Sequence, residues 1–165
     1  MARALLIGCG CHARAAGGIL AERGWSVRGT TRSPERMSGI EVAGIEGAIA
    51  DPDRVGTVSE LLGDVTVLAW LLGSARGSDV ELGALHEERL PSLLAALVDT
   101  PVRGVVYEAA GSVPAEILAA GRREVERLGE RHRIPVRILD AARDVEADDW
   151  AVAAAGAIEG VLAGP

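Results

Sequence analysis

The 165-residue chain contains no lysine, asparagine, glutamine or phenylalanine, and all 17 of its basic side chains are arginines. Without lysine, a mechanism that needs a Schiff base or a catalytic amine is excluded. No apolar run approaches the roughly 20 residues that a membrane-spanning helix requires, and no secretory leader precedes the first apolar run. We therefore expect a cytoplasmic protein that does not engage a membrane.

The chain also lacks a basic surface and a metal-binding pattern. The net charge of −7 and the pI near 5.0 differ from the basic surface of most nucleic-acid binders. The two cysteines, Cys9 and Cys11, are poorly placed for a structural disulfide. With His12 they would put three ligands within four residues, and no second cysteine pair completes a metal site. We expect neither a nucleic-acid partner nor a bound metal.

Apolar runs of strand length alternate with helical patterns along the chain, and the hydrophobic content of 48% suits one domain spanning residues 1–165. The expected strands are residues 4–7, 26–31, 47–50, 65–72, 102–107 and 136–139. The expected helices are residues 13–23, 54–62, 80–98, 114–132 and 149–162, with a short helix that Ser33 caps before Pro34. This alternation predicts an α/β fold, a Rossmann-like doubly wound parallel sheet of about six strands in a three-layer α/β/α arrangement.

The loop after the first expected strand has the pattern G-x-G-x-x-A. Gly8 permits the tight turn, Gly10 lets a pyrophosphate approach the backbone, and Ala13 lets the next helix pack closely. The free N–H groups and the dipole of that helix, which Cys11 and His12 directly precede, hold an anion. Because the pattern follows a strand and opens a helix, it predicts a dinucleotide site.

Other interpretations of this loop remain open. A tight turn in a protein that binds no ligand is one of them. A redox-active thiol is another, since a helix N-terminus lowers a thiol pKa, although we favour small apolar fillers for Cys9 and Cys11. His12 and Arg14 either add positive charge near the phosphates or face solvent.

The end of the second expected strand indicates which nucleotide is favoured. NAD sites usually carry an acidic residue there for the ribose hydroxyls, and residues 28–33 contain none. Thr31, Arg32 and Ser33 offer hydroxyls and a guanidinium group, which suit a 2′-phosphate. The alternative for Arg32 is a solvated surface residue. The sequence therefore favours NADP over NAD.

Several segments resemble a known family. They include Ile7-Gly8-x-Gly10-x-x-Ala13, Thr30-Thr31-Arg32-Ser33-Pro34, Ala50-Asp51-Pro52-Asp53, Gly104-Val105-Val106-Tyr107-Glu108 and residues 124–139. They are similar to the extended and atypical short-chain dehydrogenase/reductases, closest to the NAD(P)H-binding, NmrA-like and epimerase/dehydratase-like branch. The resemblance spans nearly the whole chain.

The resemblance implies roles for particular residues. Arg32 would take the 2′-phosphate, and Asp51 would face the adenine edge. The ribose on the nicotinamide side would be flanked by Ala69, Trp70, Leu71 and Leu72. The nicotinamide pocket would be bordered by Glu108, Ala109 and Ala110. The family also suggests a homodimer.

The family's catalytic pair, a tyrosine followed four residues later by a lysine, is missing. The single tyrosine, Tyr107, is expected inside the fifth strand, and the chain has no lysine. Arg122 or Arg123 falls near the lysine position, but arginine stays charged and relays protons poorly. There is also no room for a substrate subdomain after the sixth strand. The resemblance therefore supports cofactor binding by this chain better than it supports the family's catalytic activity.

Three further features have two interpretations each. Trp70 either covers the nicotinamide or a substrate pocket, or it packs in the core. His86, which precedes Glu87 and Glu88, is expected on a solvated helix face. The acidic run of Asp144, Glu146, Asp148 and Asp149 is expected in a solvated loop rather than at a metal, with Asp148 or Asp149 capping the last helix.

Our first hypothesis is a small NADP-dependent oxidoreductase that transfers hydride to or from an unknown organic molecule. Its proton would come from solvent, Ser74, Ser112 or Glu108, and Glu108 is the most testable donor because burial would favour its protonated form. The second hypothesis is a non-catalytic module that senses the redox state of NADP. The third is an interaction protein with a vestigial site, which would bind no nucleotide.

Overall fold

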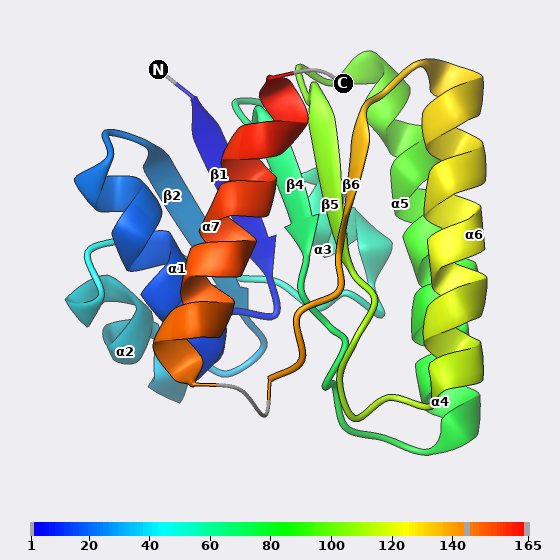
Figure 1. Cartoon of the computed structure of the whole chain (residues 1–165), viewed down its shortest axis with the longest axis horizontal. Coiled ribbons are helices and arrows are strands. Elements are labelled where there is room, and N and C mark those ends of the chain that lie inside the picture. The colour runs from blue at the N-terminus through cyan, green and yellow to red at the C-terminus, as the bar shows by residue number, and fades with distance from the viewer. Residues whose placement is uncertain (1, 144–145, 164–165) are drawn as a thin grey trace.

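The computed structural model describes residues 2–143 and 146–163, and in them six parallel strands form one sheet (Figure 1). The strands are β1 (Arg3–Ile7), β2 (Ser26–Thr31), β3 (Glu46–Ile49), β4 (Val67–Trp70), β5 (Gly104–Glu108) and β6 (Val136–Leu139). Their order is β3-β2-β1-β4-β5-β6, and every neighbouring pair is parallel. The order reverses between β1 and β4. In such sheets, ligands bind beyond the carboxyl ends of the strands at this switch point.

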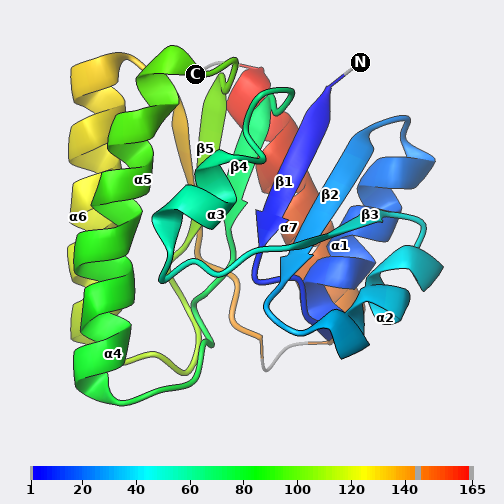
Figure 2. The same cartoon turned by 180° about the vertical axis from the view of Figure 1, so that it is seen from behind.

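Helices cover both faces of the sheet (Figure 1 and Figure 2). One face carries α1 (Cys11–Glu22), α2 (Met37–Val42) and α7 (Ala147–Leu162), and the other carries α3 (Val55–Ser59), α4 (Asp79–Ala84), α5 (Leu90–Ala96) and α6 (Ala115–His132). Short turns η1 (Pro34–Arg36), η2 (Leu85–Arg89) and η3 (Leu97–Asp99) complete the connections. The expected doubly wound, three-layer α/β fold is confirmed.

Two hydrophobic cores lie on opposite faces of the sheet because successive strand residues point to opposite sides. In β1, Leu6 belongs to the core beneath α1 and α7, whereas Leu5 and Ile7 belong to the core beneath α5 and α6. Both faces are buried, which explains why the central strands are nearly continuous apolar runs. Within the described ranges, no helix is both long and apolar enough to cross a bilayer.

The structure corrects several element bounds. The helix expected over residues 80–98, with a bend or interruption near Pro91, is indeed divided there, into α4, a π-helical turn η2, α5 and η3. Pro91 lies just after this turn, and a proline inside a helix lacks an N–H and crowds the preceding turn. The expectation that Asp148 or Asp149 caps the last helix is wrong, since Glu146 holds the N-cap position and makes no side-chain cap. Asp144 of the acidic run lies outside the described residues.

The π-helical turn also corrects the expectation for His86. The side chain is fully buried rather than solvated. Its Nε2 lies 3.1 Å from the carbonyl oxygen of Leu72, and its Nδ1 lies 2.8 Å from the hydroxyl of Tyr107. A carbonyl can only accept, so Nε2–H donates to Leu72 and Nδ1 accepts from Tyr107. An extra residue in a helical turn changes which side chains face the core, and regular 3.6-residue periodicity cannot anticipate this change.

Burial lowers the pKa of His86 from 6.5 to about 4. The unfolded chain therefore binds more protons at this residue between pH 6.5 and 4, and the free energy of unfolding should fall as the pH decreases through this range. We expect a loss on the order of 2–3 kcal/mol from His86. Urea titrations at several pH values should show a greater loss for the wild-type chain than for His86→Leu. Equal losses in the two proteins would contradict this assignment.

Candidate functional site

A cleft of about 470 Å³ opens at the carboxyl edge of the sheet, at the switch point between β1 and β4. It is formed by the loops that follow β1, β2, β3 and β4, by η1 and by residues of α4 and η2. The sequence-predicted residues that line it are Gly8, Gly10, Thr31, Arg32, Leu71, Leu72 and Ser74. The cleft therefore lies where the sheet topology leads one to expect a ligand.

The fold requires glycine at one of the two glycine positions in the first loop and not at the other. Gly8 has φ +88°, and a Cβ there would lie 2.6 Å from Cδ2 of Leu72 and 2.7 Å from the carbonyl oxygen of Leu71. The fold itself therefore requires glycine at this position. Gly10 has φ −83°, and a Cβ there would meet no protein atom within 4 Å. Neither its backbone nor its packing demands glycine, so a requirement would come from whatever occupies the open space.

That open space lies at the beginning of α1. Gly10 is the N-cap residue, no side chain caps this helix, and its first turn contains no acidic residue. The first N–H groups of a helix have no intrahelical partner and carry the positive end of its dipole. Ala13 is fully buried in the core where α1 meets the sheet. The geometry fits a phosphate group placed over Gly10.

Four arginines line the cleft, Arg32, Arg36, Arg76 and Arg143. Arg32 is exposed, and its guanidinium lies 3.9 Å from Asp53, which is also 3.9 Å from Arg89. The carboxylate of Asp53 thus lies within 3.9 Å of two guanidinium groups next to the end of β2. Such guanidinium groups suit multidentate binding of phosphate oxygens.

Sequence reasoning did not select Arg36, Arg76 or Arg143. Arg36 ends η1, which follows β2, and Arg143 lies in the loop after β6, so their positions after strands were a usable signal. Arg76 lies in the loop between β4 and α4. Whether an arginine in such a loop reaches the cleft depends on the path of the loop, which local sequence patterns do not specify.

Glu108 is fully buried, and its carboxylate forms an ion pair with the guanidinium of Arg143. Nε and Nη2 of Arg143 donate to its two carboxylate oxygens at 2.9 and 3.0 Å, and the backbone N–H of Gly73 donates to it at 2.8 Å. Nη2 of Arg143 also donates to the carbonyl oxygen of Leu71 at 3.1 Å. Glu108 does not line the cleft, contrary to the expectation that it supplies a proton there.

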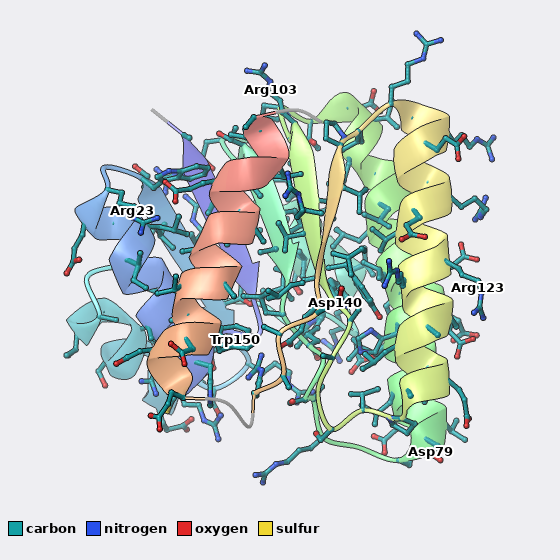
Figure 3. All side chains as sticks on the ribbon, viewed as in Figure 1. Arg23, Asp79, Arg103, Arg123, Asp140 and Trp150 are labelled. Carbon is teal, nitrogen blue, oxygen red and sulfur yellow. The ribbon has the colours of Figure 1, made fainter. Side chains whose placement is uncertain are left out.

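Arg143 is held from its other side by an aromatic ring. Its guanidinium carbon lies 4.7 Å from the centre of the Trp150 ring, and the edge of His12 packs against the same tryptophan at 5.7 Å between ring centres. Figure 3 shows Trp150 near the start of α7, toward the end of the molecule where the strands end. His12 therefore packs on a side chain that supports Arg143.

Several sequence-predicted residues do not line the cleft. Trp70 is fully buried in the core beneath α5 and α6, which agrees with the core-packing interpretation. Ser112 is exposed on the loop after β5, and its backbone N–H donates to Oγ of Ser74 at 3.2 Å. Ala109 packs partly buried against the core. Glu108, Ser112, Trp70 and Ala109 are thus not gathered at one open site.

The remaining candidates lie around the cleft without lining it. Asp51 accepts a hydrogen bond from the backbone N–H of Asp53 at 3.0 Å, which stabilises the turn before α3. The backbone N–H of Ser33 donates to the hydroxyl of Thr31 at 3.1 Å. Ser33 is the N-cap residue of η1, as expected, but its side chain makes no cap hydrogen bond. These contacts shape the loops at the ends of β2 and β3.

The cysteines have different environments. Cys9 is buried against Gly29, and burial raises the pKa of its thiol to about 12, which agrees with a filler role. Cys11 is exposed, contrary to that expectation, and Nη2 of Arg14 donates to its sulfur at 2.8 Å. In the part of the chain that the structure describes, no three histidine, cysteine or acidic side chains gather as a metal site would require.

Comparisons with solved structures show the same fold in several enzymes. A UDP-N-acetylglucosamine 4-epimerase from Bacillus cereus superposes with a TM-score of 0.72 at 15% identity, over 96% of this chain and 74% of its own. Yeast methylglyoxal/isovaleraldehyde reductase in complex with NADPH gives 0.66 at 12% identity, over 86% of this chain and 55% of its own. Triphenylmethane reductase from Citrobacter sp. gives a TM-score of 0.64 at 17% identity, over 84% of this chain and 48% of its own.

These likenesses agree with the family resemblance at the level of the fold. The chain spans about half the length of the two reductases. No protein-family model and no curated protein sequence matches it. At such low identity the comparisons show that the chain has the Rossmann-type fold of epimerases and reductases, and function has to be argued from the site.

Proposed function

We propose that the cleft binds NADP(H), with the pyrophosphate over Gly10 and the 2′-phosphate beside Arg32 and Arg36. The observation that carries the proposal is the pair of arginines that line the cleft after β2, where residues 28–33 contain no acid. An acidic residue there would suit the free ribose hydroxyls of NAD, whereas arginine accommodates a 2′-phosphate. The open space over Gly10 supports the placement of the pyrophosphate.

Asp53 would compete with the 2′-phosphate for Arg32. The two side chains are exposed and 3.9 Å apart, and a loose exposed pair of this kind contributes about 0–1 kcal/mol. A phosphate that forms two charge-assisted hydrogen bonds would displace it. Asp53 thus lowers the affinity for the 2′-phosphate modestly and does not block the site.

The Arg32→Ala variant should bind NADPH at least tenfold more weakly, a loss of about 1.4 kcal/mol, with little change for NADH. Asp53→Asn should bind NADPH a few-fold more tightly. Calorimetric titration with NADPH, NADH, NADP⁺ and NAD⁺ measures both effects. Arg103→Ala is the matched control, because Figure 3 shows Arg103 at the opposite end of the molecule and the charge removed is the same.

Two results would count against the proposal. If Arg32→Ala and Arg103→Ala weakened NADPH binding equally, Arg32 would act only through the overall charge of the protein. If none of the four nucleotides bound, the third hypothesis of a vestigial site would replace the proposal.

The geometry favours a nucleotide-binding module over a hydride-transferring enzyme. Glu108 is buried and paired with Arg143, Ser112 does not line the cleft, and the chain lacks the tyrosine–lysine pair. A small oxidoreductase is the second candidate, and the position of Ser74 in the cleft favours it. NADPH would supply the hydride and the Ser74 hydroxyl a proton. NADPH oxidation that depends on an added acceptor and that Ser74→Ala slows would support the oxidoreductase. If no acceptor gave oxidation, the nucleotide-binding module would be the remaining candidate.

A further inference from the structure

The crevice of a doubly wound sheet has two halves, one over β1–β3 and one over β4–β6, and a dinucleotide lies across both. In this protein the two halves contribute unequally to the cleft. The described residues that line it come from the first half and from the β4 connection through η2, and from farther along the chain only Arg143 contributes. The first half of the crevice is therefore open, and the second half is open on its β4 side only, because no residue of β5 or of the loop at 109–111 lines the cleft.

The loops after β4 and β5 close the second half by direct backbone contact. The N–H of Val113 donates to the carbonyl oxygen of Gly73 at 3.0 Å. A Cβ on Gly73 would lie 2.2 Å from the carbonyl oxygen of Ala110, and a Cβ on Gly111 would lie 2.1 Å from that of Gly73. No methyl group fits at either glycine, so the two loops are in direct backbone contact at these positions.

Arg143 lines the cleft and joins the residue after β4 to the end of β5. It is bound to both oxygens of Glu108 and to the carbonyl of Leu71, and it stacks on Trp150. A ligand that displaced it would leave the fully buried carboxylate of Glu108 without its counter-ion, which is strongly unfavourable. A nicotinamide ring lacks the fork of N–H donors that these acceptors use.

We infer that the cleft takes only the adenine-nucleotide half, an adenosine carrying phosphates at both the 5′ and 2′ positions, and leaves the nicotinamide half in solvent. This inference rests on the proposed NADP(H) binding and deepens it. Because the nicotinamide makes no contact, oxidised and reduced cofactor bind equally. The site then reports the presence of the phosphorylated nucleotide, and neither redox sensing nor hydride transfer takes place in it.

The test is a calorimetric titration of the wild-type protein with adenosine 2′,5′-bisphosphate, NADP⁺, NADPH and nicotinamide mononucleotide. We expect the first three ligands to bind within threefold of one another and the mononucleotide to show no binding. The emission of NADPH should not change on binding, because its nicotinamide ring stays in water. Arg32→Ala should lower the affinities for the bisphosphate and for NADPH by the same factor.

Failure of the inference and failure of the proposed function are distinguishable. If NADPH binds at least tenfold more tightly than adenosine 2′,5′-bisphosphate, or if NADPH and NADP⁺ differ by tenfold, the second half is open and the inference is overturned while NADP(H) binding stands. An enhanced, blue-shifted NADPH emission overturns it in the same way. If no nucleotide binds, the proposed function itself fails, and the inference fails with it.

Discussion

A Gly10→Ala variant should fold with nearly wild-type stability and bind NADPH at least tenfold more weakly. A Cβ at position 10 meets no protein atom within 4 Å, and φ −83° is accessible to alanine. Loss of glycine at the N-cap should cost less than about 1 kcal/mol. The added methyl group instead occupies the space proposed for the pyrophosphate, and a tenfold weaker affinity corresponds to about 1.4 kcal/mol. Urea denaturation and calorimetry measure the two quantities separately.

Gly8→Ala is the matched comparison two residues away. Its φ of +88° and the two contacts below 3 Å predict a loss of about 1–3 kcal/mol in the free energy of unfolding. The two variants therefore separate a glycine that the ligand requires from one that the fold requires. Unchanged NADPH affinity in Gly10→Ala would show that no phosphate lies over this residue.

Removing Arg143 should destabilise the protein more than removing the carboxylate that it binds. Arg143→Ala leaves Glu108 charged, fully buried and without a counter-ion, and such a change typically costs about 3–5 kcal/mol. In Glu108→Gln the amide oxygen still accepts from Gly73, and the 19%-exposed guanidinium of Arg143 reaches water. We expect a cost of about 1–2 kcal/mol for that variant.

The double variant Glu108→Ala/Arg143→Ala should be more stable than Arg143→Ala alone, because no unpaired charge remains buried. Arg137→Ala is a suitable control, since Arg137 also donates to a backbone carbonyl, that of Gly160, but from an exposed position. Denaturant unfolding of the four variants and the wild-type chain gives the comparison. If Arg143→Ala cost no more than Arg137→Ala, Arg143 would not hold a buried charge.

The same ion pair connects stability with specificity. Arg143 joins the loop after β6 to the ends of β4 and β5 through Leu71 and Glu108. The contact joins loops at the carboxyl edge of the sheet, and in the proposed binding mode it would limit how much of a dinucleotide the second half of the crevice can take. A variant that opens this contact would be expected to change ligand preference and stability together.

Local sequence patterns were sufficient for the fold and for the first loop of the site. Apolar runs of strand length, separated by helical periods, predict a parallel sheet whose central strands are buried on both faces. The glycine pattern after the first strand and the acid-free end of the second strand lie at the ends of their strands, where the topology brings them together. Gly8, Gly10, Thr31 and Arg32 consequently line one cleft.

The tertiary structure alone decided the state of the titratable groups. Glu108 meets Arg143 across 35 residues, and His86 meets Tyr107 across 21 residues, after a π-helical turn that periodicity does not encode. Trp70 falls in the core because its strand position points beneath α5. Periodicity determines which face a residue occupies within its own element, but the contacts that bury a charge or close a loop arise when separate elements pack. For this reason the sequence was enough to place the proposed nucleotide site at the carboxyl edge of the sheet, and only the packing of the loops decided which residues line the cleft.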